Sequence, residues 1–96
     1  MLINKGITEG EVITLKLTSG EEIVAKLVED GAVYYKLSRP MVIGMGQNGP
    51  GLMPYLFTVN PSTDVKLQKS TVTVAEATDA QFAKQFLEST TGIALA

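Results

Sequence analysis

The sequence predicts a mainly β fold: a small, strongly bent, five-stranded antiparallel barrel followed by one C-terminal α-helix. Apolar residues alternate with polar ones through residues 12–37, which is the two-residue period of strands with one buried face. Later apolar runs are short and are interrupted by proline and glycine, as in a sheet that bends. A helical period begins only after Ala77. We therefore expect a curled sheet with a helix packed on it or on a neighbouring subunit.

Length and composition limit the class of protein. The 96 residues fit one domain, which we divide into an N-terminal arm at 1–10, a barrel at 11–76 and a C-terminal helix and tail at 78–92. The chain has no Cys and no His, so it lacks thiolate and imidazole groups for metal binding or catalysis. We expect no enzyme, no catalytic residue, no metal and no cofactor. No apolar run reaches membrane-spanning length and no leader is evident, which predicts a cytoplasmic protein without a membrane partner.

The first three strands form a meander whose turns are constrained by parity. Strand one covers 11–17, and its buried residues can share a face with those of strand two only if the loop between them has an odd number of residues. At the next turn the same argument favours a three-residue loop at 29–31, with Leu27 opposite Val33. Gly31 would then adopt a left-handed conformation, which glycine tolerates best.

Proline and glycine organise the middle of the chain. Strand three begins at Ala32, bends at Pro40, where the backbone donor is missing, and resumes over 41–45. The Gly- and Pro-rich run at 46–54 predicts an exposed loop. The alternating apolar residues of 55–59 predict strand four.

A change of parity marks the end of the barrel. Val65 and Leu67 share one parity, whereas Val72 and Val74 have the opposite one. Because a one-residue slip moves every side chain to the other face, a turn or bulge must lie at 68–71. It separates the end of strand four from a short strand five.

The C-terminal segment has the pattern of an amphipathic helix over 79–89. Thr78 and Gln81 form a capping-box pair at its start, and Gly92 is a stop signal beyond its end. Two pairs of apolar residues one helical turn apart define its buried face: Phe82 with Phe86, and Ala83 with Leu87.

Several runs taken together have a family resemblance. The run L-T-S-G-E-E-I-V-A-K-L, an exposed acidic turn, Y-Y-K-L, a Gly-rich loop and V-K-L-Q-K-S-T-V-T-V follow one another. Over residues 11–76 this order resembles the Sm-like fold of Sm, LSm and Hfq proteins. It is most similar to the divergent Sm-like proteins of tailed phages, including marine viruses, which also carry a helix after the fifth strand. The resemblance implies a homo-oligomeric ring, closed by pairing of the fourth and fifth strands of adjacent subunits, and a host-cytoplasmic location if the protein is viral.

The resemblance also implies where RNA would bind. Sm proteins hold a base with an Asp and an Asn around the turn after strand two and with an Arg-Gly pair between strands four and five. Here Asp30 matches the first position, Tyr34 lies near the Asn position, and Gln68 and Lys69 stand where Arg-Gly would be. We therefore expect these four residues to bind RNA or single-stranded nucleic acid. Tyr34 would stack on a base and Lys69 would meet a phosphate.

Two functions stay open at this point. One is an RNA-binding ring, in which Lys66 or Arg39 adds phosphate contacts. The other is a structural or protein-interaction ring of phage origin without RNA binding, because the net charge is −2 and the Asn and Arg-Gly are missing. Tyr34 would then be a half-exposed strand aromatic. The outward-facing lysines have two interpretations: they form a basic stripe, or they pair with nearby Glu and serve solubility. They are Lys16, Lys26 and Lys36.

Overall fold

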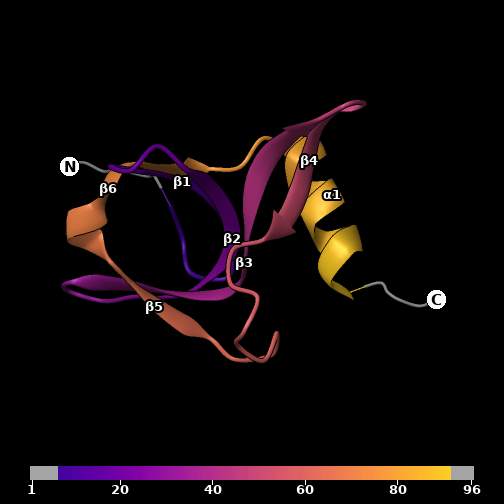
Figure 1. Cartoon of the computed structure of the whole chain (residues 1–96). Helices are drawn as coiled ribbons and strands as arrows, with labels where there is room; N and C mark the ends of the chain where they lie inside the picture. The colour runs from indigo at the N-terminus through magenta and orange to yellow at the C-terminus, as the bar shows by residue number, and fades with distance from the viewer. Residues whose placement is uncertain (1–6, 92–96) are drawn as a thin grey trace.

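The computed structural model describes residues 7–91, which form an antiparallel sheet of six strands and one C-terminal helix (Figure 1). The predicted mainly β class with a terminal helix is confirmed. The first six residues of the predicted arm, the predicted stop at Gly92 and the tail after it lie outside the described residues. The elements are β1 (Val12–Leu17), β2 (Glu22–Asp30), β3 (Tyr34–Gly46), β4 (Gly49–Pro54), β5 (Val65–Gln68), the 3-10 helix η1 (Lys69–Thr71), β6 (Val72–Ala77) and α1 (Ala80–Thr91).

The long strand β3 organises the sheet. The strands pair in the order β4-β3-β2-β1-β6, and β5 also pairs with β3. One edge of β3 pairs with β2. Along the other edge, residues 34–37 of β3 pair with β5, and residues 41–46 of β3 pair with β4. After β5, η1 turns the chain so that β6 can pair with β1. Strands β1, β2, β3, β5 and β6 thereby form a barrel-like curl, with β4 and α1 to one side of it (Figure 1).

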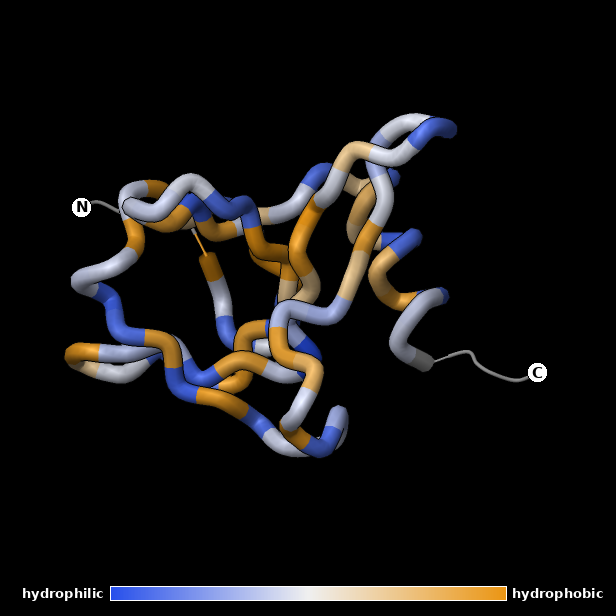
Figure 2. Tube along the Cα trace, viewed as in Figure 1, coloured by the Kyte–Doolittle hydropathy of each residue, from blue (hydrophilic) through white to orange (hydrophobic). Residues whose placement is uncertain are grey.

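The main core comes from the alternating runs of the first three strands. Its side chains are at most 5% exposed and have the parity predicted for β1 and β2. Figure 2 shows hydrophobic residues recurring along the strands of the curl. Val33, which the same pattern assigns to this face, is instead 63% exposed. The buried members are Ile13, Leu15, Leu17, Ile23, Ala25, Leu27 and Leu37.

The first turn has the odd length that parity predicts. Lys16 pairs with Glu22, and the Leu17 amide donates to the Glu21 carbonyl at 2.9 Å, which leaves three residues in the loop. Gly20 closes this loop with φ of +107°. Glycine is favoured there because a Cβ is strained in the left-handed region.

The second turn differs from the prediction. Leu27 pairs with Leu37 and not with Val33, and β2 continues to Asp30, which pairs with Tyr35. Gly31 is outside the left-handed region. The reason is a register shift between Leu27 and Glu29, a β-bulge whose extra residue reverses the parity on which the prediction depended.

A second bulge bends β3 where the sequence predicts a bend. The register with β2 shifts across the Arg39-Pro40 pair, and Arg39 has φ of +52°. A proline lacks the amide needed for a regular ladder, so a bulge is a site that tolerates it. The predicted interruption of strand three at Pro40 is confirmed as this bulge.

The predictions for 46–54 and 55–59 are wrong. The Gly- and Pro-rich run is not a loop, because its residues from Gly49 onwards form β4, paired with β3 around a tight turn in which Gly49 has φ of +101°. Residues 55–59 form no strand. Since β4 already occupies that part of the β3 edge, the next apolar run has no edge left to pair with. Prolines at both ends of β4 are tolerated because an edge strand needs fewer donors.

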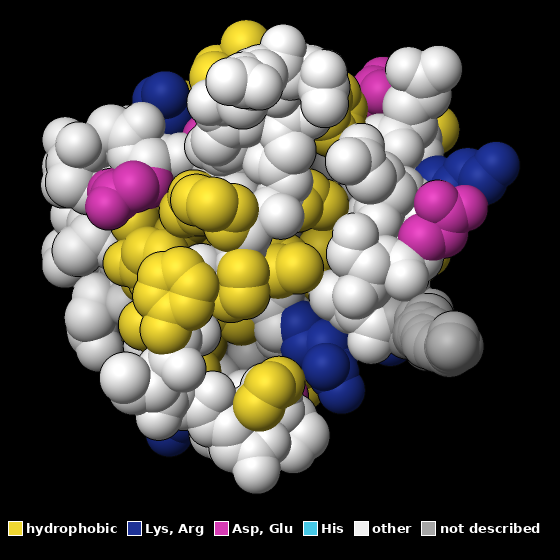
Figure 3. Space-filling model, turned by 45° about the vertical axis from the view of Figure 1, so that its right-hand side comes forward, with side chains coloured by type: hydrophobic (Ala, Val, Ile, Leu, Met, Phe, Trp, Pro, Cys, Tyr) yellow, Lys and Arg dark blue, Asp and Glu magenta, His cyan; other side chains and the backbone are white. Residues whose placement is uncertain are grey.

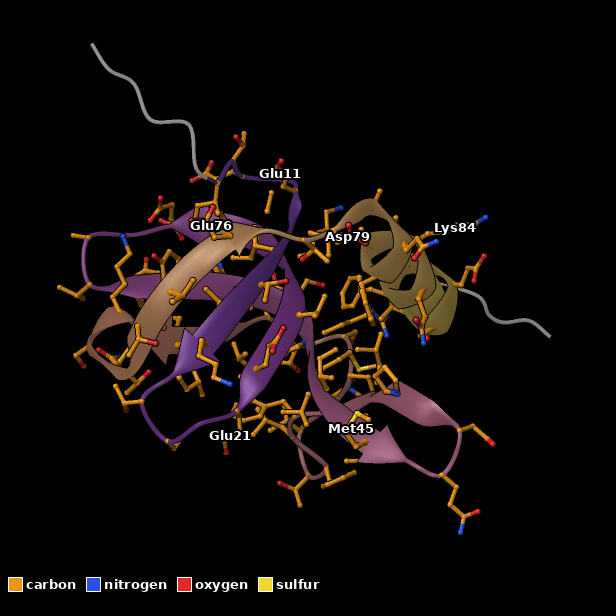
Figure 4. All side chains as sticks on the ribbon, turned by 90° about the horizontal axis from the view of Figure 1, so that it is seen from above. Glu11, Glu21, Met45, Glu76, Asp79 and Lys84 are labelled. Carbon is orange, nitrogen blue, oxygen red and sulfur yellow. The ribbon has the colours of Figure 1, made fainter. Side chains whose placement is uncertain are left out.

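The C-terminal predictions hold in outline. The parity slip at 68–71 is confirmed as η1, and the helix begins one residue later than predicted. Its cap is Asp79, whose carboxylate accepts a bond from the Gln81 amide at 3.2 Å, whereas the Thr78 hydroxyl bonds to that of Thr14 at 2.8 Å. Figure 4 shows Asp79 at the start of the helix and Lys84 on the side that points away from the strands.

The helix covers the part of the outer face of β2 around Val24 and leaves Lys26 exposed. Phe86 and Val24 are 2% and 1% exposed, but neither belongs to the main core cluster. Val24 has the opposite parity to Ile23 and Ala25, so it points away from that core. Leu87, predicted on the buried face, is 44% exposed. Contact between α1 and β2 therefore forms a second, smaller apolar layer.

Candidate functional site

The two segments that carry the predicted site residues lie side by side at one end of the sheet. Asp30 ends β2 and Tyr34 begins β3, whereas Gln68 ends β5 and Lys69 begins η1. They converge because β3 pairs with both β2 and β5. The register divides them between two faces, which the sequence alone does not indicate.

Asp30 and Lys69 lie on the inner face with Tyr35, and we call these three residues the inner cluster. The Lys69 ammonium is 2.6 Å from a carboxylate oxygen of Asp30 and 4.8 Å from the centre of the Tyr35 ring. The Lys69 amide also donates to the Val33 carbonyl at 2.9 Å, which holds η1 against the turn between β2 and β3. The inner cluster therefore links the two segments by both side chain and backbone.

The hydrogen bond from Lys69 to Asp30 raises the pKa of the lysine above its ordinary 10.5, and partial desolvation opposes that shift. The charges of Asp30 and Tyr35 add to the increase. The two charged side chains remain 32% and 40% exposed, so their pair contributes little to stability, about 0–1 kcal/mol. The main effect of this ion pair is to hold the Lys69 ammonium against the Asp30 carboxylate, so that another anion must compete with Asp30 for it.

Tyr34 and Gln68 lie on the outer face as direct partners in the ladder between β3 and β5. The Lys66 ammonium stands 5.0 Å from the centre of the Tyr34 ring. Partial desolvation, the charge of Glu29 and a hydrogen bond to Glu29 together raise the pKa of Tyr34 above its ordinary 10.0. Glu29 and Lys36 also pair on this face, so we call these five residues the outer cluster.

Each of the two adjacent tyrosine rings therefore contacts one lysine ammonium: Tyr34 contacts Lys66 on the outer face, and Tyr35 contacts Lys69 on the inner face. Cation–π contact of this kind orients an ammonium group without neutralising it. A base could stack on the Lys66 side of the Tyr34 ring only after Lys66 moved aside. Sequence reasoning missed Tyr35 because its parity assigns it to the core, against which it also packs.

An apolar pocket of about 310 Å³ lies on another part of the surface, between the β3 bulge, the segment after β4 and the end of α1. Residues 40–63 contain no charged side chain, and Phe57 is 78% exposed. Figure 3 shows apolar side chains gathered on this side of the molecule. Arg39 reaches the pocket, whose apolar lining includes Pro40, Met41, Leu56, Phe57, Val59 and Val65.

Comparison with protein-family models and with curated proteins finds no match for this chain. Among the described residues, no helix has both the length and the apolar character needed to span a membrane. No three carboxylates come together as a metal site in the same part of the chain.

Proposed function

We propose that the protein is a ring-forming Sm-like module that binds single-stranded RNA, in the cytoplasm or, if it is viral, in that of the host. One observation carries the proposal: Asp30 and Lys69, from turns far apart in the sequence, are 2.6 Å apart at one end of the curl. These are two of the positions to which the family resemblance assigns RNA binding. Mixed cation and aromatic groups suit a single strand, which offers both phosphates and unstacked bases.

The open strand edges support ring formation. Within the described residues, β5 pairs only with β3, and β6 only with β1, so each has one edge without a partner strand. Unpaired edges of this kind favour addition of a strand from another chain. If β5 of one copy pairs with β6 of the next, the contact is head-to-tail, and repetition closes a ring when the rotation allows it.

The mass in solution tests the ring. Light scattering on the purified protein should give one species with an integral multiple of the chain mass of 10.3 kDa. A proline at Thr73 or Ala75 would place a residue without an amide donor in β6 and should reduce that mass. A monomeric wild type would overturn the ring.

Binding of a labelled single-stranded RNA tests the ligand. We expect affinity at low salt that weakens as salt increases, because phosphate contacts release counterions. K69A and Y34A should weaken it, whereas K84A, on the outward side of α1, is the matched control and should not. Absence of binding by the wild type at low salt would exclude the RNA ligand.

The uncharged surface around the pocket favours a second candidate, a structural or protein-interaction ring without RNA. Interface cores are depleted in charge, and an exposed phenylalanine such as Phe57 is a typical anchor for a protein partner. The same two measurements separate the candidates. A ring mass together with no RNA binding at low salt supports this second function.

A further inference from the structure

The outer face carries a row of three lysines on three adjacent strands. Lys36 of β3 is the direct ladder partner of Lys66 of β5, and Lys26 of β2 is the partner of Ser38, two residues along β3 from Lys36. Direct partners have Cβ atoms about 4.5–5.5 Å apart and diagonal ones about 7–8 Å. The sequence suggests a stripe of Lys16, Lys26 and Lys36, whereas the structure extends the row from Lys36 to Lys66, on the side of β3 away from β2 and β1.

Their surroundings differ from those of an ordinary solubilising lysine. Lys16 faces Glu22 directly, as expected of a cross-strand charge pair. Lys26 has Val12 and Ser38 as its direct ladder partners, and neither carries a carboxylate. Lys36 has Glu29 on one side, but its partner on the other is Lys66.

Two like charges in direct register destabilise a sheet. Lys66 is turned over the Tyr34 ring, which orients its ammonium but leaves its charge. Among residues 7–91 the ion pair that forms is the one between Lys69 and Asp30, on the inner face. An anion bound between Lys36 and Lys66 would convert their repulsion into attraction.

We infer that Lys26, Lys36 and Lys66 form a phosphate-binding track for the backbone of single-stranded RNA, across the outer face of β2, β3 and β5. This inference rests on the proposed function and adds the path of the strand. Lysine suits the task because its long stem and compact charge can follow a flexible backbone. The track starts beside Tyr34 and leads away from the inner cluster.

The salt dependence of RNA affinity tests the track. Each phosphate contact contributes about 0.7 to the slope of log affinity against log salt for a single strand. In the triple variant K26Q/K36Q/K66Q the slope should therefore be less steep than in the wild type, by about 2. When salt is raised fourfold, the wild type should lose about 20-fold more affinity than the triple variant loses.

Two controls complete the experiment. K16Q removes a strand lysine that faces Glu22 and should leave the slope unchanged. K26R/K36R/K66R keeps the charges and should keep the slope, which separates charge from any change in folding. An unchanged slope in the glutamine triple variant would overturn the track while leaving the proposed function intact. Absence of RNA binding by the wild type would overturn both.

Discussion

The Tyr34 ring lies against the Cα of Gly31. A Cβ added at Gly31 would stand 2.7 Å from Cζ of the ring and 2.9 Å from Cε1, closer than such atoms approach one another. The Gly31 amide also donates to the Tyr34 carbonyl at 2.9 Å and closes the hairpin. Glycine is thus favoured here by the position of the neighbouring ring and not by a left-handed φ.

We expect G31A to be destabilising by about 1–3 kcal/mol, because the new methyl group displaces the ring or strains the turn. Urea denaturation would measure the change. In a double-mutant cycle, G31A should cost much less when combined with Y34A. Equal costs in the two backgrounds would mean that the backbone, and not the ring, selects glycine.

D30N should change folding stability by no more than about 1 kcal/mol, because the ion pair that it removes is partly exposed. Its effect on RNA affinity should be larger and positive, because the release of Lys69 from its carboxylate outweighs the loss of the contact that Asp30 itself makes with RNA. D64N, which neutralises the exposed aspartate just before β5, is the matched control. Lower RNA affinity in D30N would show that the contact of Asp30 with RNA outweighs its hold on Lys69.

The fold should lose stability at alkaline pH. Tyr34 and Lys69 both have pKa values raised above 10.0 and 10.5, so the folded protein retains protons that the unfolded chain releases. Their stabilisation is complete below those ordinary values and disappears as pH rises through the folded pKa values. Denaturation at increasing pH would measure the loss.

The variant E29Q isolates the tyrosine part of this effect. It removes a charge and an acceptor that raise the pKa of Tyr34, so that pKa should move down towards 10.0. Ultraviolet absorbance of tyrosinate would follow the titration. A titration identical to the wild type would contradict the role of Glu29.

F86A should be destabilising by about 3–5 kcal/mol, because the ring is 2% exposed and fixes α1 on β2. K84A, on the outward side of the same helix, should change stability by less than about 0.5 kcal/mol. Circular dichroism during denaturation would compare the two. A small effect of F86A would mean that the helix is held by other contacts.

Periodicity in the sequence predicts the fold where one face is buried and the ladder is regular. It identifies the buried residues of β1 and β2 and the odd length of the first turn. It fails at the second turn because the bulge after Leu27 inserts a residue that no local signal marks. It also misassigns 55–59, since the choice between two runs for one edge of β3 depends on the whole sheet.

The candidate site was predictable in position but not in detail. Strand order alone brings Asp30 and Lys69 to the same end of the sheet. The two-residue period of a strand places Tyr34 and Tyr35 on opposite faces, but their neighbours depend on register. Asp30 faces Tyr35 because of the bulge after Leu27, and Lys36 faces Lys66 through the pairing of β3 with β5. Sequence spacing cannot supply that register.

The shared edge of β3 has a consequence for how this chain can vary. Since β5 uses the edge before Arg39 and β4 uses it after the bulge, the β3–β4 hairpin takes no partner away from the strands that enclose the core. Beyond Val42, which still pairs with Ile23 of β2, the hairpin pairs with no strand of the curl, so this outer part can change in length, or accept an inserted peptide at its tip, without opening the curl. The bulge at Arg39 and Pro40 therefore separates the segment of β3 that pairs with β5 from the segment that forms the hairpin with β4.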